Sequence, residues 1–259
     1  MKNFFTLVPT RVQFEQFWIE IGKRNIWLIK LRYAAVGMLL SLIVGIYFLE
    51  YIDAGFSIKE LPLILITISI LFYNLIFHHI WKSRPPTIEW RKRFHSLHFS
   101  LLQVLTDLIA LMLFVYYTGG VESPVAALFV FHVIIGSLFF PGTIIGIIII
   151  CCTIIMGTGS ILELYGIIPH YGVYGFLNAP IYGNINYIIV FFIFFEISML
   201  ISIYLANSIS KELYKRERSL SQAYSELASA EETKSRYVMT IVHEDRKSTR
   251  LNSSHRIRH

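Results

Sequence analysis

The sequence has few charged residues and almost no cysteine. Only 15% of its 259 residues are Asp, Glu, Lys or Arg, whereas 55% are hydrophobic. A soluble domain is rarely this apolar, so the composition predicts a polytopic protein embedded in a lipid bilayer. The two cysteines, Cys151 and Cys152, are adjacent within an apolar run. Adjacent cysteines cannot form an unstrained disulfide, so we expect both to act as small hydrophobic side chains.

The sequence also lacks a cleavable signal and a strong excess of one charge. Charged residues from Lys2 to Arg24 interrupt any apolar stretch that would serve as a signal peptide. The net charge is +6, but residues 245–259 carry five basic residues and one acidic residue, or +4. The rest of the chain therefore carries only +2, which gives no reason to expect a nucleic acid partner.

Hydrophobic segments that approach the length of a membrane span occur six times. A helix needs about 20 largely apolar residues to cross the hydrocarbon core. The fourth and fifth segments come from residues 123–162, which contain no Asp, Glu, Lys or Arg, and we expect Pro141-Gly142 to fold this stretch into a hairpin. The predicted spans are 33–51, 61–81, 97–117, 124–140, 142–164 and 185–206. The sequence thus predicts an all-α membrane protein with a six-helix domain over residues 33–206.

The distribution of Lys and Arg predicts the orientation of these spans. Six precede the first span, five lie between the second and third, and four lie just after the sixth, at residues 211–218. The opposite loops contain only Lys59. Because positive residues stay on the cytoplasmic side, we expect a multi-pass protein of the bacterial cytoplasmic (inner) membrane with both termini in the cytoplasm.

The N-terminal segment, residues 1–32, contains a short amphipathic pattern. Phe14, Phe17, Trp18 and Ile21 recur at helical spacing and give one apolar face. This pattern indicates either a helix lying on the inner membrane surface or a helix packed against the bundle.

Residues 207–244 are polar, contain no Gly or Pro, and predict one long cytoplasmic signalling helix. Apolar residues recur at two heptad positions, which favours a parallel coiled coil and hence a homodimer. One position holds Leu213, Leu220, Leu227 and Ile241, with Lys234 interrupting; the other holds Ile209, Ala223, Ala230 and Tyr237, with Arg216 interrupting. The alternative is an exposed connector helix that makes no dimer.

The end of this helix, KSRYVMTIVHE over residues 234–244, resembles the H-box of sensor histidine kinases. The resemblance implies that His243 is the phosphoacceptor and that Glu244 is the general base that accepts a proton from the other ring nitrogen. It also implies ATP and Mg as cofactors of the intact parent and a cytoplasmic response regulator as the partner. The alternative is an ordinary surface histidine.

The third and fourth spans with their joining loop resemble the membrane domain of the RegB/PrrB type of redox-responsive histidine kinase, which has a G-G-x-x-N-P-F loop associated with quinone. Gly119, Gly120 and Pro124 match this motif, whereas Ser123 and Val125 stand in place of Asn and Phe. The resemblance implies quinone as a candidate ligand. A tight Gly-Gly turn followed by a proline that starts a helix accounts for the same residues.

Two acidic residues, Asp107 and Glu196, lie in the middle of predicted spans. Ionisable groups are costly there, so we expect either a buried sensor site or a structural hydrogen bond between helices. The candidate partners are histidines of the second and fourth spans: His78, His79 and His132. Glu163 is expected near the outer surface, and no set of residues has the spacing of a metal site.

Residues 245–259 do not continue the H-box pattern. The segment DRKSTRLNSSH, residues 245–255, resembles the in-frame translation of a sequencing-library adapter. We therefore expect this tail to be an artefact that follows a truncated kinase, and the ATP-binding domain to lie in the intact parent.

Two other classes of protein remain open on the sequence alone. In a transporter or channel fragment, Asp107 and Glu196 would line a pathway, and inverted repeats and interrupted helices would be expected. In a membrane receptor with another output domain, the same sensor would precede a cyclase or a phosphatase. The His243-Glu244 pair favours the kinase over both.

Overall fold

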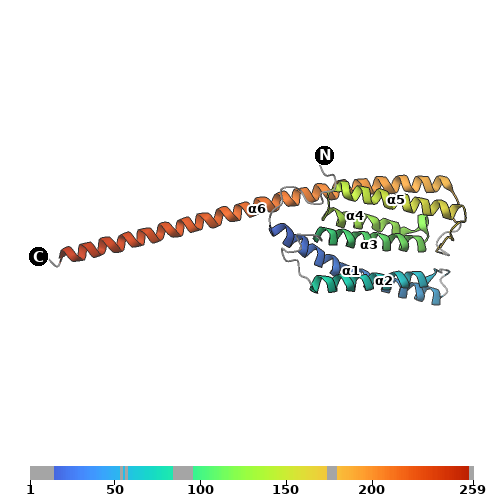
Figure 1. Ribbon diagram of the computed structural model, residues 1–259, viewed down its shortest axis with the longest axis horizontal. Helices are drawn as coiled ribbons and strands as arrows, with labels where there is room; N and C mark the ends of the chain where they lie inside the picture. Colours follow the sequence, from blue (N-terminus) through green and yellow to red (C-terminus); the bar gives the residue numbers. More distant parts are fainter. Residues whose placement is uncertain (1–14, 53–54, 56–57, 84–95, 174–179, 257–259) are drawn as a thin grey trace. The chain divides into compact units, whose positions relative to one another are not determined.

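The computed structural model is helical, and the residues that it describes contain no strand. The described residues are 15–52, 55, 58–83, 96–173 and 180–256, and for residues 15–20, 96, 214, 217, 218, 221, 240 and 242–256 only the backbone is described. The elements, shown in Figure 1, are α1 (Glu15–Tyr51), α2 (Glu60–Ser83), α3 (Ser96–Tyr117), the 3-10 helices η2 (Gly120–Glu122) and η3 (Pro124–Leu128), α4 (Phe129–Ser137), α5 (Gly142–Leu164) and α6 (Ile185–Arg256). The predicted all-α class is confirmed.

The chain forms two compact units. The first extends from Met1 to Asn207 and the second from Ser208 to His259, so the boundary falls within α6. In the second unit the helix carries ion pairs one turn apart, Arg216 to Glu212 at 3.2 Å and Arg236 to Glu232 at 2.7 Å. Such exposed pairs each add about 0.3–0.5 kcal/mol to a helix.

Five helices of the described chain are long and apolar enough to span a membrane, and a sixth helical segment is shorter. The five lie within α1, α2, α3, α5 and α6, and the shorter segment is Pro124–Ser137. The sequence predicted a fourth span up to Phe140, but the helix ends earlier because the amides of Phe139 and Phe140 turn back to the Gly136 carbonyl. At about 2.0 Å per 3-10 residue and 1.5 Å per α residue, this segment reaches roughly 23 Å, less than the hydrocarbon core of about 30 Å.

Helix α1 begins well before the predicted first span. It runs without a break from Glu15 to Tyr51, and Ile21 is buried in the main hydrophobic core. Burial of Ile21 favours the packed alternative for this helix over a separate surface helix. Phe14 lies outside the described residues, as do the side chains of Phe17 and Trp18.

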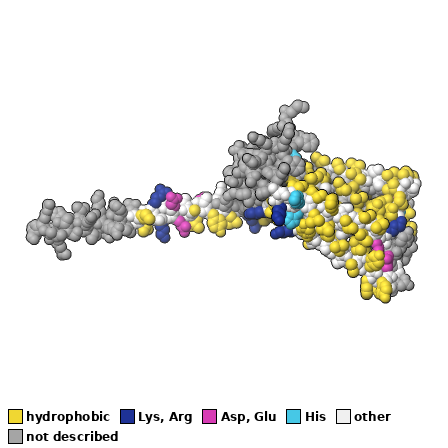
Figure 2. Space-filling model, turned by 60° about the horizontal axis from the view of Figure 1, so that its bottom comes forward, with side chains coloured by type: hydrophobic (Ala, Val, Ile, Leu, Met, Phe, Trp, Pro, Cys, Tyr) yellow, Lys and Arg dark blue, Asp and Glu magenta, His cyan; other side chains and the backbone are white. Residues whose placement is uncertain are grey.

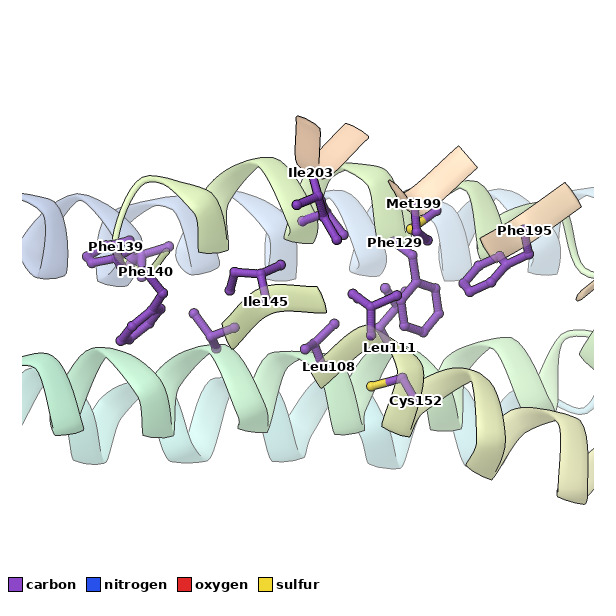
Figure 3. Packing of buried hydrophobic residues seen from close by; sticks show 14 of the residues in the cluster. Leu108, Leu111, Phe129, Phe139, Phe140, Ile145, Cys152, Phe195, Met199 and Ile203 are labelled. Carbon is purple, nitrogen blue, oxygen red and sulfur yellow. The ribbon is translucent and has the colours of Figure 1, made fainter. Parts of the chain in front are cut away.

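Helix α3 is the central helix of the first unit. It has the largest buried share of the five candidate spans, and it packs against α1, α2, α4 and α5. Figure 3 shows the main core, in which Phe129 of α4 lies between Leu111 of α3 and the α6 residues Met199 and Phe195. The Phe129 and Phe195 rings meet edge to face, with centroids 5.3 Å apart. This core joins α4 to both α3 and α6.

The outer surface of the first unit is apolar. Figure 2 shows hydrophobic side chains covering most of the visible face of this unit. Large side chains such as Val44, Phe72, Ile154 and Phe194 are 62–69% exposed. A soluble protein would not expose a continuous apolar surface of this extent, whereas a bilayer covers it.

Two phenylalanines of α4 provide a matched test of this packing. Phe129 is fully buried, whereas Phe131 is 60% exposed. We expect Phe129→Ala to lower the unfolding free energy by about 3–5 kcal/mol, because it leaves a cavity in the core. Phe131→Ala should have little effect. Thermal unfolding in detergent would measure both, and equal losses would contradict this account of the core.

Candidate functional site

A bidentate ion pair lies inside the helical bundle and joins α1 to α3. The Arg32 Nε lies 2.7 Å from Oδ1 of Asp107, and the Arg32 Nη2 lies 3.0 Å from Oδ2. The two side chains are 5% and 13% exposed. Two parallel N–H donors facing one carboxylate make the strongest geometry for such a pair, and each charge would be costly to bury alone.

Helix α2 completes this polar cluster. The Tyr73 hydroxyl donates to Oδ1 of Asp107 at 2.8 Å, and Arg32 donates to Oδ1 of Asn74 at 3.2 Å. Asn74 in turn donates to the Ile29 carbonyl at 3.1 Å. The Arg32 guanidinium also lies over the rings of Tyr73 and Phe77, 5.7 and 5.2 Å from their centroids. The Arg32–Asp107 cluster therefore ties three helices together.

The histidine partners predicted for Asp107 and Glu196 are wrong. His78 of α2 contacts α1, where its ring lies 3.0 Å from the Tyr33 hydroxyl. The other two candidates contact their own helices: His79 lies 3.3 Å from the Ser83 hydroxyl, and His132 lies 3.1 Å from the Leu128 carbonyl. Glu196 accepts a hydrogen bond from Thr153 of α5 at 2.7 Å. Among the side chains that the structure describes, neither acidic residue forms a hydrogen bond or ion pair with a histidine.

Arg32 was missed because it immediately precedes the predicted first span and was counted as a loop charge. A signal was present in the spacing of α1. Ile21, Asn25, Leu28, Arg32 and Val36 recur every three or four residues, and all five are buried. A cation on the buried face of a membrane helix implies a buried acidic partner, and Asp107 was already a candidate.

The Gly119-Gly120 loop adopts the tight turn that was the structural alternative to a quinone motif. Both glycines have positive φ, 121° and 58°, a region that favours glycine. The Ser123 hydroxyl accepts a hydrogen bond from the Val125 amide at 3.2 Å and so caps η3, which begins at Pro124. A Cβ on Gly120 would lie 2.9 Å from a Glu163 carboxylate oxygen. The positive φ of Gly120 therefore favours glycine, and any larger residue would also displace the Glu163 carboxylate.

A second cluster of ionisable side chains adjoins this loop. Glu163, which was expected near the outer surface of the membrane, is buried, with 4% exposure, in the last turn of α5. His170 Nδ1 lies 3.4 Å from a Glu163 oxygen, and its Nε2 lies 3.4 Å from a Glu122 oxygen. Glu122 also accepts hydrogen bonds from the amides of Ile181 and Tyr182. Local sequence spacing gave no signal for this cluster, because its members come from three separate segments.

An open apolar cavity of about 640 Å³ borders the same loop. It lies between α1, α2 and α3, and Pro124, Val125 and Val173 line one side of it. The described lining is largely apolar, and its hydroxyl groups, those of Ser41 and Thr118, donate to the carbonyls of Met38 and Phe114. Quinone as a ligand stays a prediction.

The predicted catalytic residues lie in the second unit. The backbone of His243 and Glu244 is helical and belongs to α6. Their side chains lie outside the described residues, so their catalytic roles stay predictions. No group of three His, Cys, Asp or Glu residues in the described part of the chain is arranged to hold a metal ion.

The fold and the buried polar clusters define a polytopic helical membrane domain. Residues 15–212 match the family model described as the PilS-like transmembrane domain, so the chain belongs to this family. PilS is a sensor histidine kinase, and the match supports a membrane sensor domain of that kind. The matching family is thus PilS-like, where the sequence suggested the RegB/PrrB type. No curated protein and no solved structure matches the chain.

The Arg32–Asp107 cluster predicts unequal effects of two neutralising substitutions. Asp107→Asn leaves the Arg32 charge buried without its counter-ion, so we expect a loss of about 3–5 kcal/mol in unfolding free energy. Glu196→Gln serves as the control, because its amide oxygen still accepts from Thr153. Thermal unfolding in detergent would compare them.

A double variant refines this test. Arg32→Met combined with Asp107→Leu removes both charges, so it should cost less than the sum of the two single changes. Additive losses would show that the two charges do not stabilise each other.

Proposed function

We propose that this chain is the sensing and transmission part of a sensor histidine kinase. In the intact protein, a signal received by the membrane domain would control ATP-dependent phosphorylation of His243 and transfer of the phosphoryl group to a response regulator. The observation that carries the proposal is the order of parts. A PilS-like domain over residues 15–212 is followed, on the same helix, by an H-box-like segment.

The second unit supports a dimer as the form that signals. Its heptad residues Leu213, Leu220 and Leu227 are 56–60% exposed in the single chain. Apolar residues at one heptad position become buried when two copies of a helix form a parallel coiled coil. A homodimer would bury this stripe and place the two His243 side chains on neighbouring helices.

The proposed orientation follows from the charges. Both termini would lie in the cytoplasm of a bacterium, because the loops predicted to face outward carry only Lys59. His243 would then be accessible to ATP and to a cytoplasmic response regulator.

Phosphoryl transfer would require from this chain only that His243 be correctly positioned and uncharged. A neutral imidazole is a good nucleophile near neutral pH, so one ring nitrogen of His243 would attack the phosphoryl group. Glu244 would accept the proton from the other ring nitrogen. ATP with Mg, held by an ATP-binding domain of the intact parent, supplies the phosphoryl group when bound.

Labelling of the intact gene product with radioactive ATP tests the phosphoacceptor. We expect His243→Gln to abolish acid-labile labelling, because glutamine has no nucleophilic ring nitrogen that could form the phosphoramidate bond. Tyr224→Phe is the control, since Tyr224 is exposed on the same helix and lies at neither heptad position. Retained labelling in the His243→Gln protein would reject His243.

A further inference from the structure

The Glu122–His170–Glu163 cluster joins three segments at one end of the bundle. Glu122 belongs to η2, Glu163 to the last turn of α5, and His170 to the connection between α5 and α6. The Glu122, Glu163 and His170 side chains are only 8%, 2% and 13% exposed. Three ionisable groups are therefore held largely away from water, where their charges must balance.

His170 lies between two carboxylates. One oxygen of Glu122 and one of Glu163 each lie 3.4 Å from a His170 ring nitrogen, which is ion-pair distance, although neither ring nitrogen has a hydrogen-bond partner among the described residues. A positive charge on the imidazole would be attracted to both carboxylates. A neutral ring would leave two negative charges with no positive charge between them.

Few other groups can replace that positive charge. The sequence from Thr118 to Asn184 contains no Lys or Arg. Lys59, from the connection between α1 and α2, lies over the Tyr171 ring, 4.7 Å from its centroid. Within the described part of the chain, two tyrosines lie beside the cluster. Tyr182 stacks on the His170 ring with centroids 3.8 Å apart, and the Tyr116 hydroxyl donates to the Pro169 carbonyl at 2.8 Å.

His170 lies in the connection between α5 and α6, so its ion pairs with Glu122 and Glu163 bear on how this connection is held. Its segment leads directly into α6, and Glu122 fixes the last part of that segment through the Ile181 and Tyr182 amides. On the other side, Glu163 lies against Gly120, which follows the end of α3. The cluster thus fastens the α5–α6 connection to the ends of α3 and α5.

We propose that Glu122, His170 and Glu163 form a proton-sensitive latch, closed when His170 is protonated and released when it is neutral. With both termini in the cytoplasm, as proposed, this end of the bundle would lie outside it, and the latch would respond to the pH of the external compartment. That orientation and the step from the latch to kinase output rest on the proposed function, whereas the pH response of the latch itself does not.

Melting temperature measured against pH in detergent tests the latch without any kinase activity. Histidine ordinarily changes charge between about pH 5 and 8. Protonation stabilises the closed form, so stability should be greatest at the acid end of this range and be lost as the pH rises. We expect the melting temperature to fall by about 3 °C or more between about pH 5.5 and about pH 8. The carboxylates ordinarily stay ionised over this range.

Three variants make the test specific. His170→Gln should remove the pH-dependent step and melt near the alkaline value of the wild type throughout. Glu163→Gln keeps the shape of the cluster but removes one charge, so it should reduce the step even if His170→Gln fails to fold. His132→Gln changes a histidine of α4 outside the cluster and should keep the full step. A full step in His170→Gln, or in Glu163→Gln, would overturn the latch.

Discussion

The buried ion pair between Arg32 and Asp107 is the constraint on which the arrangement of α1, α2 and α3 depends. Inside a bilayer neither charge can separate from the other without a large desolvation cost. Tyr73 and Asn74 bind to the same pair, so α2 is fixed along with α1 and α3. The pair thereby sets the relative positions of three helices, which packing between apolar surfaces alone specifies less strictly.

The contacts on the other side of α3 are of a different kind. Phe129, Val133 and Met199 pack in a largely apolar core that joins α3 to α4 and α6. Such contacts are non-directional, and in a membrane they compete with equally apolar lipid. On this side the Thr153 hydroxyl of α5 donates a hydrogen bond to Glu196 of α6, and the Glu122–His170–Glu163 cluster lies at one end. The Arg32–Asp107 pair thus belongs to α1, α2 and α3, whereas the contacts of α4 and α6 with α3 are largely apolar.

The sequence predicted the elements better than their contacts. The spans of α2, α3 and α5 were confirmed within one or two residues at each end, because long apolar runs and the Pro141-Gly142 break are strong local signals. The shortened helix at Pro124–Ser137 was not predicted, since composition does not distinguish a helix from the turn that follows it.

The polar sites required information that the sequence holds only non-locally. Asp107 was recognised as unusual, but its partner Arg32 was assigned to a loop, and histidines were suggested in its place. Glu163 was dismissed, although it meets His170 and Glu122 from distant segments. Spacing along the chain can show that a charge lies on a buried helix face, but it cannot show which face of another helix it meets.

The central claim is that the helix leaving this membrane domain carries the phosphoacceptor of a histidine kinase. The most direct measurement is the sequence of the source gene beyond the codon for Glu244. The account predicts that the reading frame continues with a hydrophobic residue, then a run of basic, small and proline residues, and later an ATP-binding domain with Asn- and Gly-rich boxes. A gene that continues with no such segment and no ATP-binding domain would contradict it.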